Sequence, residues 1–165
     1  MLPAYKQILQ QSISQKEETK KFLHKLKRTK PNDLDNNCNT LHYKAFENID
    51  CLQCANCCIT TGPLLLHKDI ERLSQSLSMR QAAFTNQYLR QDEDGDLVFK
   101  NMPCPFLDEH SYCNVYEARP NACREYPHTQ QRKIINKLDI TFHNSTICPA
   151  VAKVVEGLKK IYGNT

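Results

Sequence analysis

Four cysteines fall within eight residues, in the stretch Cys51-Leu-Gln-Cys54-Ala-Asn-Cys57-Cys58, and this stretch constrains the chain more than any other. Thiolates are soft ligands that suit zinc, copper(I) and iron–sulfur clusters, and spacers of two residues let one tight loop direct several sulfurs toward one ion. Four further cysteines follow at Cys104, Cys113, Cys123 and Cys148. The sequence therefore predicts that these eight cysteines bind metal.

Length and composition decide how the cysteines are interpreted. The chain has 165 residues, enough for one modest core. It has no apolar run near the roughly 18 residues that span a membrane, and its first residues lack the pattern of a signal peptide, so we expect a cytoplasmic protein without a membrane span. A reducing cytosol disfavours disulfides, and nine cysteines leave one thiol over in any all-disulfide scheme. Metal ligation is favoured, with disulfides and redox-active thiols as the alternatives.

Positive charge is concentrated at the start of the chain. The net charge is +4, but residues 1–30 hold eight Lys or Arg against two Glu. Apolar side chains recur near the helical period over residues 4–28, which predicts an amphipathic helix with a polar break across 14–19. We favour a helix packed against the body with a solvated basic face. A patch for nucleic acid or an acidic partner is the alternative, and no nucleic-acid motif supports it.

The residues from Pro31 to Asn37 are predicted to end this helix and form a linker. This divides the chain into a basic helix and linker over residues 1–47 and a metal-binding domain over 48–165. Cys38 and His42 lie near the linker. We interpret them as bystanders and leave them out of the ligand set.

The second part of the chain is predicted to be α+β, mostly helical and loop-rich, and folded around metal. We expect one helix over 67–77 and a second one opened by a capping box at Ser78. An acidic turn at 92–96 then leads to a strand at 97–100. Its DxDG-like run lacks the length and the terminal Glu of an EF-hand, so a hairpin turn is favoured over a calcium site.

Four more elements complete the prediction. They are a short buried strand or turn at 64–66, a loop-rich cysteine region at 101–128, a strand at 133–142, and a C-terminal helix capped by Ser145 or Thr146 and ended by Gly163.

The ordered set of cysteine motifs resembles the YkgJ-like cysteine-cluster family, also described as the zinc- or iron-chelating CxxCxxCC domain. The residues that carry the resemblance are the octapeptide, Cys104-Pro-Phe-Leu, and Cys113-x-Val-Tyr-Glu-x-Arg-Pro-x-x-Cys123-Arg-x-Tyr-Pro. It covers about residues 48–150. One departure is Ala55, where the family commonly has Gly after the second cysteine.

The resemblance implies a bacterial cytoplasmic protein that binds a metal or an iron–sulfur cluster. Some relatives are iron–sulfur proteins, and the flagellin lysine-N-methylase carries a related cysteine domain. This chain has no glycine-rich cofactor signature that would support methyl transfer. Whether it is an enzyme is left open, and no catalytic residue is assigned.

Eight thiolates suffice for two four-cysteine zinc sites, or for one or two iron–sulfur clusters. Cys57 and Cys58 are expected to point in different directions along an extended backbone, and Cys148 is expected to be a thiolate because it begins a helix. Arg119 and Arg124 are candidate donors to the sulfurs. The alternative for Arg119 is an ion pair with Glu117 or Glu125.

The favoured function is a metal-binding protein that chelates zinc or iron, or holds an iron–sulfur cluster, through clustered cysteines. The alternatives are an iron–sulfur oxidoreductase or methylase-related enzyme, a thiol redox sensor, and an interaction module that uses the basic helix. An enzyme should offer an open metal position, and eight thiols can close two sites completely. The expected partner is the metal ion, nucleic acid and membranes are disfavoured, and a protein partner is left open.

Overall fold

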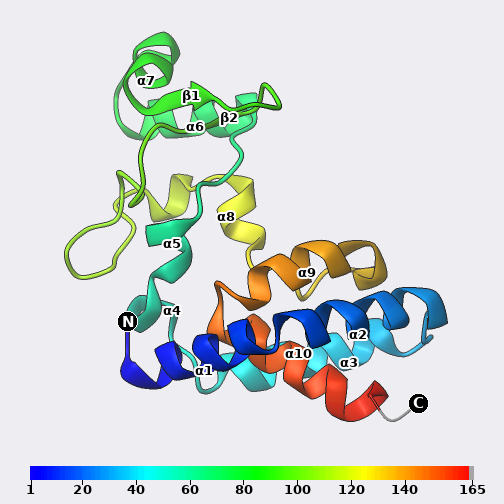
Figure 1. The fold of residues 1–165 in the computed structure, drawn as a ribbon. Coiled ribbons are helices and arrows are strands. Elements are labelled where there is room, and N and C mark those ends of the chain that lie inside the picture. The colour runs from blue at the N-terminus through cyan, green and yellow to red at the C-terminus, as the bar shows by residue number, and fades with distance from the viewer. Residues whose placement is uncertain (164–165) are drawn as a thin grey trace. The chain divides into compact units, whose positions relative to one another are not determined.

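The computed structural model describes residues 1–163, and in this part of the chain it has ten α-helices, one hairpin and two 3₁₀ helices (Figure 1). The helices are α1 (Pro3–Ser14), α2 (Lys16–Thr29), α3 (Leu34–Phe46), α4 (Cys51–Cys54), α5 (Asn56–Thr60), α6 (His67–Ser76), α7 (Gln81–Tyr88), α8 (Asn121–Glu125), α9 (Leu138–Ser145) and α10 (Pro149–Tyr162). The strands are β1 (Leu89–Gln91) and β2 (Leu97–Phe99), and the 3₁₀ helices are η1 (Tyr116–Ala118) and η2 (Ile134–Lys137). The predicted class, mostly helical α+β, is confirmed.

The chain forms two compact units. The helical unit contains Met1–Cys54 and the chain from Pro127 onward, and the hairpin unit contains Ala55–Tyr126. The unit boundary therefore falls inside the cysteine octapeptide, between Cys54 and Ala55. The division into domains at residue 47 stays a prediction.

The helical unit is organised around α10, which contacts α1, α2, α3 and α9. Val151, Val154, Val155 and Leu158 are buried and form the apolar stripe of this helix, whereas Ile161 is 46% exposed. Helices α3 and α10 approach closely at Gly157, where a Cβ would overlap the Leu41 side chain.

Three predictions in the helical unit are wrong. The single helix over 4–28 is two helices, α1 and α2, separated at Gln15. The linker gives way to α3 at Leu34, because Leu34, Cys38, His42 and Ala45 form a buried face in an otherwise polar segment. The strand over 133–142 is instead η2 followed by α9.

The reason for the last error is visible in the burial pattern. The buried residues include Ile134, Leu138, Thr141 and Ser145, which follow the helical period. The strand prediction relied on Ile135, Leu138 and Ile140, and of these three only Leu138 is buried. Asp35 of α3 holds the start of this segment, since its carboxylate accepts the backbone N–H groups of Lys133 and Ile134 at 2.8 and 2.9 Å. A contact across about a hundred residues is invisible to local sequence patterns.

The hairpin unit has its own apolar core. Strands β1 and β2 pair antiparallel with Leu89 opposite Phe99, and the same unit contains the helices α5, α6, α7 and α8 (Figure 1). The core residues are Leu65, Ile70, Leu73, Phe84, Leu89, Phe99, Phe106, Val115 and Ala118, and Cys104 and Cys113 pack against them. Two of the predicted ligands are thus fixed by the apolar core of their unit.

The local predictions for this region are confirmed in part. Helix α6, the acidic turn and strand β2 are present, and Asp92 Oδ1 closes the turn by accepting the N–H groups of Asp94 and Asp96. Residues 64–66 form neither a strand nor a turn, and only Leu65 of the three is buried, with its N–H bonded to the Leu97 carbonyl at 2.9 Å. The capping box at Ser78 is wrong, since α7 begins at Gln81.

The C-terminal helix ends at Gly163 as predicted, but the predicted N-cap residue is wrong. Pro149 does lie in its first turn, but its N-cap residue is Cys148 rather than Ser145 or Thr146, because those two residues belong to the end of α9. Gly163 follows the helix with φ of −70°, so it ends the helix without the left-handed conformation that would require glycine.

Candidate metal centre

The nine cysteines are thiols, and the eight predicted ligands divide between the two units. The helical unit contains Cys51, Cys54 and Cys148, and the hairpin unit contains the other five. Metal ligation by these residues stays a prediction, but the structure places them in defined groups.

Four thiols of the hairpin unit, which we call the four-thiol group, are Cys58, Cys104, Cys113 and Cys123. They are close enough to act on one another electrostatically: thiolates at Cys58, Cys104 and Cys113 each raise the pKa of Cys123, and Cys58 also raises the pKa values of Cys104 and Cys113. Burial is the larger cause in all three cases: it raises the pKa of Cys104 to about 11, and it raises the pKa of Cys123 although part of that residue is exposed to solvent. Four mutually interacting thiols match the complete ligand set of a tetrahedral zinc site.

Backbone geometry aims N–H groups at two of these sulfurs. The amides of Phe106 and Leu107 donate toward the Cys104 sulfur, and the amide of Val115 donates toward the Cys113 sulfur, which opposes the effect of burial on both pKa values. The segments are tied together, because the Cys104 N–H bonds to the Cys58 carbonyl at 2.8 Å and Leu107 bridges to Cys113. Such N–H···S contacts stabilise a metal-bound thiolate.

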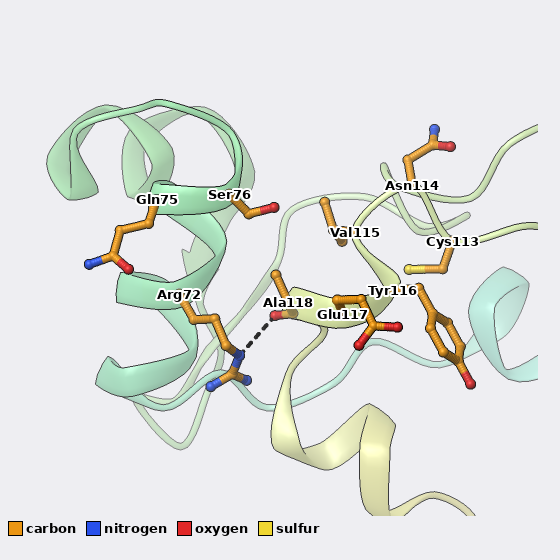
Figure 2. A pocket seen from close by; sticks show the side chains of 9 residues that line it. All are labelled: Arg72, Gln75, Ser76, Cys113, Asn114, Val115, Tyr116, Glu117 and Ala118. Atoms are coloured by element: carbon orange, nitrogen blue, oxygen red, sulfur yellow. Dashed lines mark hydrogen bonds between the residues drawn. The ribbon is translucent and has the colours of Figure 1, made fainter.

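A buried carboxylate fixes the segment that leads to Cys123. Asp69 of α6 is fully buried, and it accepts hydrogen bonds from the N–H groups of Leu66 and Asn121, both at 3.0 Å, and from Arg72 at 2.6 Å. Arg72 also donates to the carbonyl of Ala118 at 3.1 Å (Figure 2). It donates to the carbonyl of Arg119 as well, at 2.8 Å.

Sequence reasoning missed this network. The only local signal was Asp69 in the first turn of a helix, with Arg72 three residues later. That spacing is also common in exposed helical ion pairs. Nothing in it pointed to the segment around Asn121.

The two arginines that were predicted to donate to the sulfurs have different contacts. Arg119 lies near the sulfurs, because its charge lowers the pKa values of Cys113 and Cys123. Its guanidinium donates to the Tyr116 carbonyl at 2.6 Å and lies 3.7 Å from the centre of the Tyr116 ring. Arg124 donates to the carbonyls of Arg119 and Glu117, so it supports the loop rather than a sulfur.

Beside the four-thiol group the surface of the hairpin unit is hollowed. The depression has a volume of about 510 Å³, and Arg72, Cys113, Asn114 and Tyr116 are among its lining residues (Figure 2). Cys113 can therefore be reached from solvent on this side.

Cys57 and Cys58 lie on helix α5, so the prediction of an extended backbone at these residues is wrong. Their sulfurs are 4.0 Å apart, and the hydrogen bond from Cys57 lowers the pKa of Cys58 to about 7. Two thiolates on one tetrahedral zinc, at ~2.3 Å from the metal, are about 3.8 Å apart. The two sulfurs are thus close to the separation that a shared ion requires.

The helical unit holds a three-thiol group, consisting of Cys51, Cys54 and Cys148. Cys51 and Cys54 are the ends of the single turn α4, and Cys148 is near enough for both to raise its pKa. The expectation of a thiolate at Cys148 is wrong for the protein without metal: burial outweighs the amides of Ala150 and Val151 and raises the pKa to about 12.

Cys38 and His42, which were left out of the predicted ligand set, belong to neither thiol group. Cys38 is buried in the helical unit, and burial raises its pKa to about 12. His42 is hydrogen-bonded to Thr129 at 2.7 Å. Both side chains therefore belong to the packed interior of the unit.

The chemistry of the donors fits a thiophilic metal, but their positions show that binding requires a rearrangement. Among the described residues, no three His, Cys, Asp or Glu side chains converge closely enough to hold an ion as they stand. Side-chain rotation within each thiol group would have to bring the sulfurs together. Metal binding and local folding are then coupled.

The sequence of this cysteine-rich chain can be compared with known protein families. A family model described as "Putative zinc- or iron-chelating domain" matches residues 50–149, more than half of the chain. The chain therefore belongs to the CxxCxxCC family, which confirms the resemblance and supports metal binding in general terms. No curated protein and no solved structure matches the chain. In the described residues, no helix is both long and apolar enough to cross a membrane.

Proposed function

We propose that this protein chelates zinc or iron through its clustered cysteines, and that the four-thiol group is its principal site. The observation that carries the proposal is the grouping of Cys58, Cys104, Cys113 and Cys123 in one unit, within electrostatic range of one another. Four thiolates satisfy a tetrahedral metal without any further ligand.

A closed shell of sulfur suits storage, delivery or structural support better than catalysis, because catalytic zinc sites keep one position open for water or substrate. The protein supplies the surroundings of the site: amide donors to Cys104 and Cys113, and the positive charge of Arg119 near Cys113 and Cys123. These features compensate the negative charge of four thiolates. We place the protein in the cytoplasm, where reduced thiols persist.

An iron–sulfur cluster is the second candidate. It is favoured by the amide groups directed at Cys104 and Cys113, because hydrogen bonds to sulfur tune the potential of a cluster. Cys57 adds a fifth sulfur next to Cys58 and allows a bridged centre or a change of ligand. A redox sensor is the third candidate, and it would use the same close pair.

The decisive experiment is anaerobic purification followed by metal and sulfide analysis and a visible absorption spectrum. A colourless protein with zinc supports the chelating site, and a brown protein with iron and sulfide supports the cluster. Cys104→Ser should lower the metal content and the melting temperature together. Cys38→Ala, which removes a buried thiol outside both groups, should leave the metal content unchanged. Full metal content in Cys104→Ser would contradict the proposal.

A further inference from the structure

We propose that the helical unit binds a medium-chain fatty acid in a groove between α1, α3 and α10. The alkyl chain lies on the apolar floor of the groove, and the carboxylate lies at the exposed lysines that line it. This inference goes beyond the proposed function, because the described residues that line the groove include no cysteine.

Three helices form the walls of this groove. Helix α10 contacts both α1 and α3 (Figure 1), and the depression between them has a volume of about 470 Å³. Pockets that bind small molecules have volumes of roughly 300–1,000 Å³. The groove therefore has the size of a small-molecule site, and it lies wholly within the helical unit.

The floor of the groove is apolar. Ala45 and Ile49 line it and are buried, whereas Ile8 and Leu41 are only partly buried. A ligand can therefore cover apolar surface of Ile8 and Leu41 that solvent still reaches. Removal of such surface from water is favourable.

The groove also carries positive charge. Its exposed lysines are Lys44 of α3 and Lys153 and Lys160 of α10. The carboxylate of Glu156 pairs with Lys153 and with Lys160, each at 2.9 Å, so one negative charge serves two ammonium groups. In the described chain no carboxylate is ion-paired with Lys44. The described lining has three lysines against one glutamate, and the carboxylate of a fatty acid complements this net charge of +2.

Hydrogen bonds hold α1 in place beside the groove. The Asp50 N–H donates to the Tyr5 hydroxyl at 2.9 Å, and the Ser12 hydroxyl donates to the Ser145 carbonyl at 2.8 Å. These bonds attach the first and the last part of α1 to segments that are distant in the sequence. A wall that is already fixed lowers the cost of ordering when a ligand binds.

The dimensions of the groove favour an alkyl chain over a helix of a partner protein. Its α10 wall runs from Lys153 to Lys160, which is about 10 Å at the rise of an α-helix. A volume of about 470 Å³ over that length corresponds to a mean cross-section of about 45 Å². An α-helix with its side chains is about 10–12 Å across, hence about 80–110 Å² in cross-section. A single alkyl chain fits this space, and a whole helix does not.

Calorimetric titration of the full chain with sodium decanoate, below its micellar concentration, tests the proposal. We expect saturable binding of one decanoate per chain. Octanoate should bind more weakly, by up to about fourfold for each CH₂ group removed. 1-Decanol has the same alkyl chain without the charge and should also bind more weakly than decanoate. Equal affinities for decanol and decanoate, or for octanoate and decanoate, would overturn the proposal.

Two pairs of variants locate the site. Ala4→Trp adds a large side chain at an exposed position that lines the groove and should abolish binding, whereas Gln7→Trp, at an exposed position of α1 outside the lining, should not. Lys44→Gln should weaken binding by about two- to fivefold, and Lys6→Gln, another exposed lysine outside the lining, should leave it unchanged. Circular dichroism checks that each variant is folded.

The variants also separate the possible failures. Decanoate binding that is unchanged in Ala4→Trp or in Lys44→Gln would overturn the proposal. Binding of an acidic amphipathic peptide without binding of decanoate would overturn it as well, by assigning the groove to a protein partner. The metal content of Ala4→Trp should equal that of the unmodified protein, so either failure leaves the proposed function intact.

Discussion

The carboxylate of Asp69 accepts a hydrogen bond from the backbone N–H of Asn121 at 3.0 Å, across 52 residues of the chain. The same carboxylate is ion-paired with Arg72 and is fully buried. Asn121 begins α8, the short helix that carries Cys123. One buried charge thus links the first turn of α6 to the position of a candidate ligand.

Asp69→Asn should destabilise the hairpin unit, because the amide carries no charge for Arg72 and replaces one acceptor oxygen with a donor. Loss of one partner of a buried, hydrogen-bonded pair costs about 3 kcal/mol, and the partial exposure of Arg72 moderates this. Urea unfolding measures the change. Glu71→Gln makes the same change on the exposed side of α6 and should cost less than about 0.5 kcal/mol. Equal effects of the two variants would show that the network is unimportant.

Gly157→Ala should destabilise the helical unit. A methyl group at this position overlaps the Leu41 side chain, so α3 and α10 must separate or Leu41 must change rotamer. Overpacking of this kind costs about 1–3 kcal/mol. The double variant Gly157→Ala with Leu41→Ala tests the cause, because removal of the Leu41 side chain should remove much of the penalty of the added methyl. Additive effects in thermal unfolding would exclude this explanation.

Ala55→Gly should not harm the protein and should stabilise it by up to about 1 kcal/mol, because Ala55 has a left-handed backbone with φ of +49°. Part of the gain is lost to the greater freedom of glycine in the unfolded chain. Ala83→Gly, at an exposed helical position of α7, should instead destabilise the protein by about 1 kcal/mol. Denaturant midpoints of the two variants should therefore move in opposite directions.

The stability of the helical unit should fall as the pH is lowered through the ordinary range of histidine. Burial lowers the pKa of His42 below its usual value of 6.5, so the unfolded chain binds the proton more readily than the folded one. The stability is then complete above about pH 6.5 and is lost as the pH falls toward the lower folded pKa.

His42→Gln should flatten this pH dependence, since the amide does not titrate. The control is His143→Gln, which alters an exposed histidine of α9 and should leave the slope unchanged. Melting temperatures measured between pH 5 and 8 compare the three proteins. A wild-type slope that survives in His42→Gln would assign the effect to another group.

Local patterns were sufficient where each element forms its own contacts. Helix α6, the hairpin with its Asp92 turn, and the apolar stripe of α10 follow from periodicity and turn residues in the sequence. Patterns failed where tertiary contacts override propensity. Helix α3 has a polar composition, yet Leu34 and Cys38 are buried, and the segment after Lys133 is helical while Asp35 caps its start.

Residue type and short spacing are local properties, so eight cysteines in an ordered pattern are enough to identify the family and to predict soft, sulfur-rich metal ligation. The grouping of the thiols depends instead on the tertiary fold. The octapeptide is divided at Ala55, so Cys51 and Cys54 lie with Cys148, whereas Cys58 lies with Cys104, Cys113 and Cys123. That partition depends on packing and hydrogen bonds between distant segments, such as the bond from Asp69 to Asn121, which no local spacing encodes.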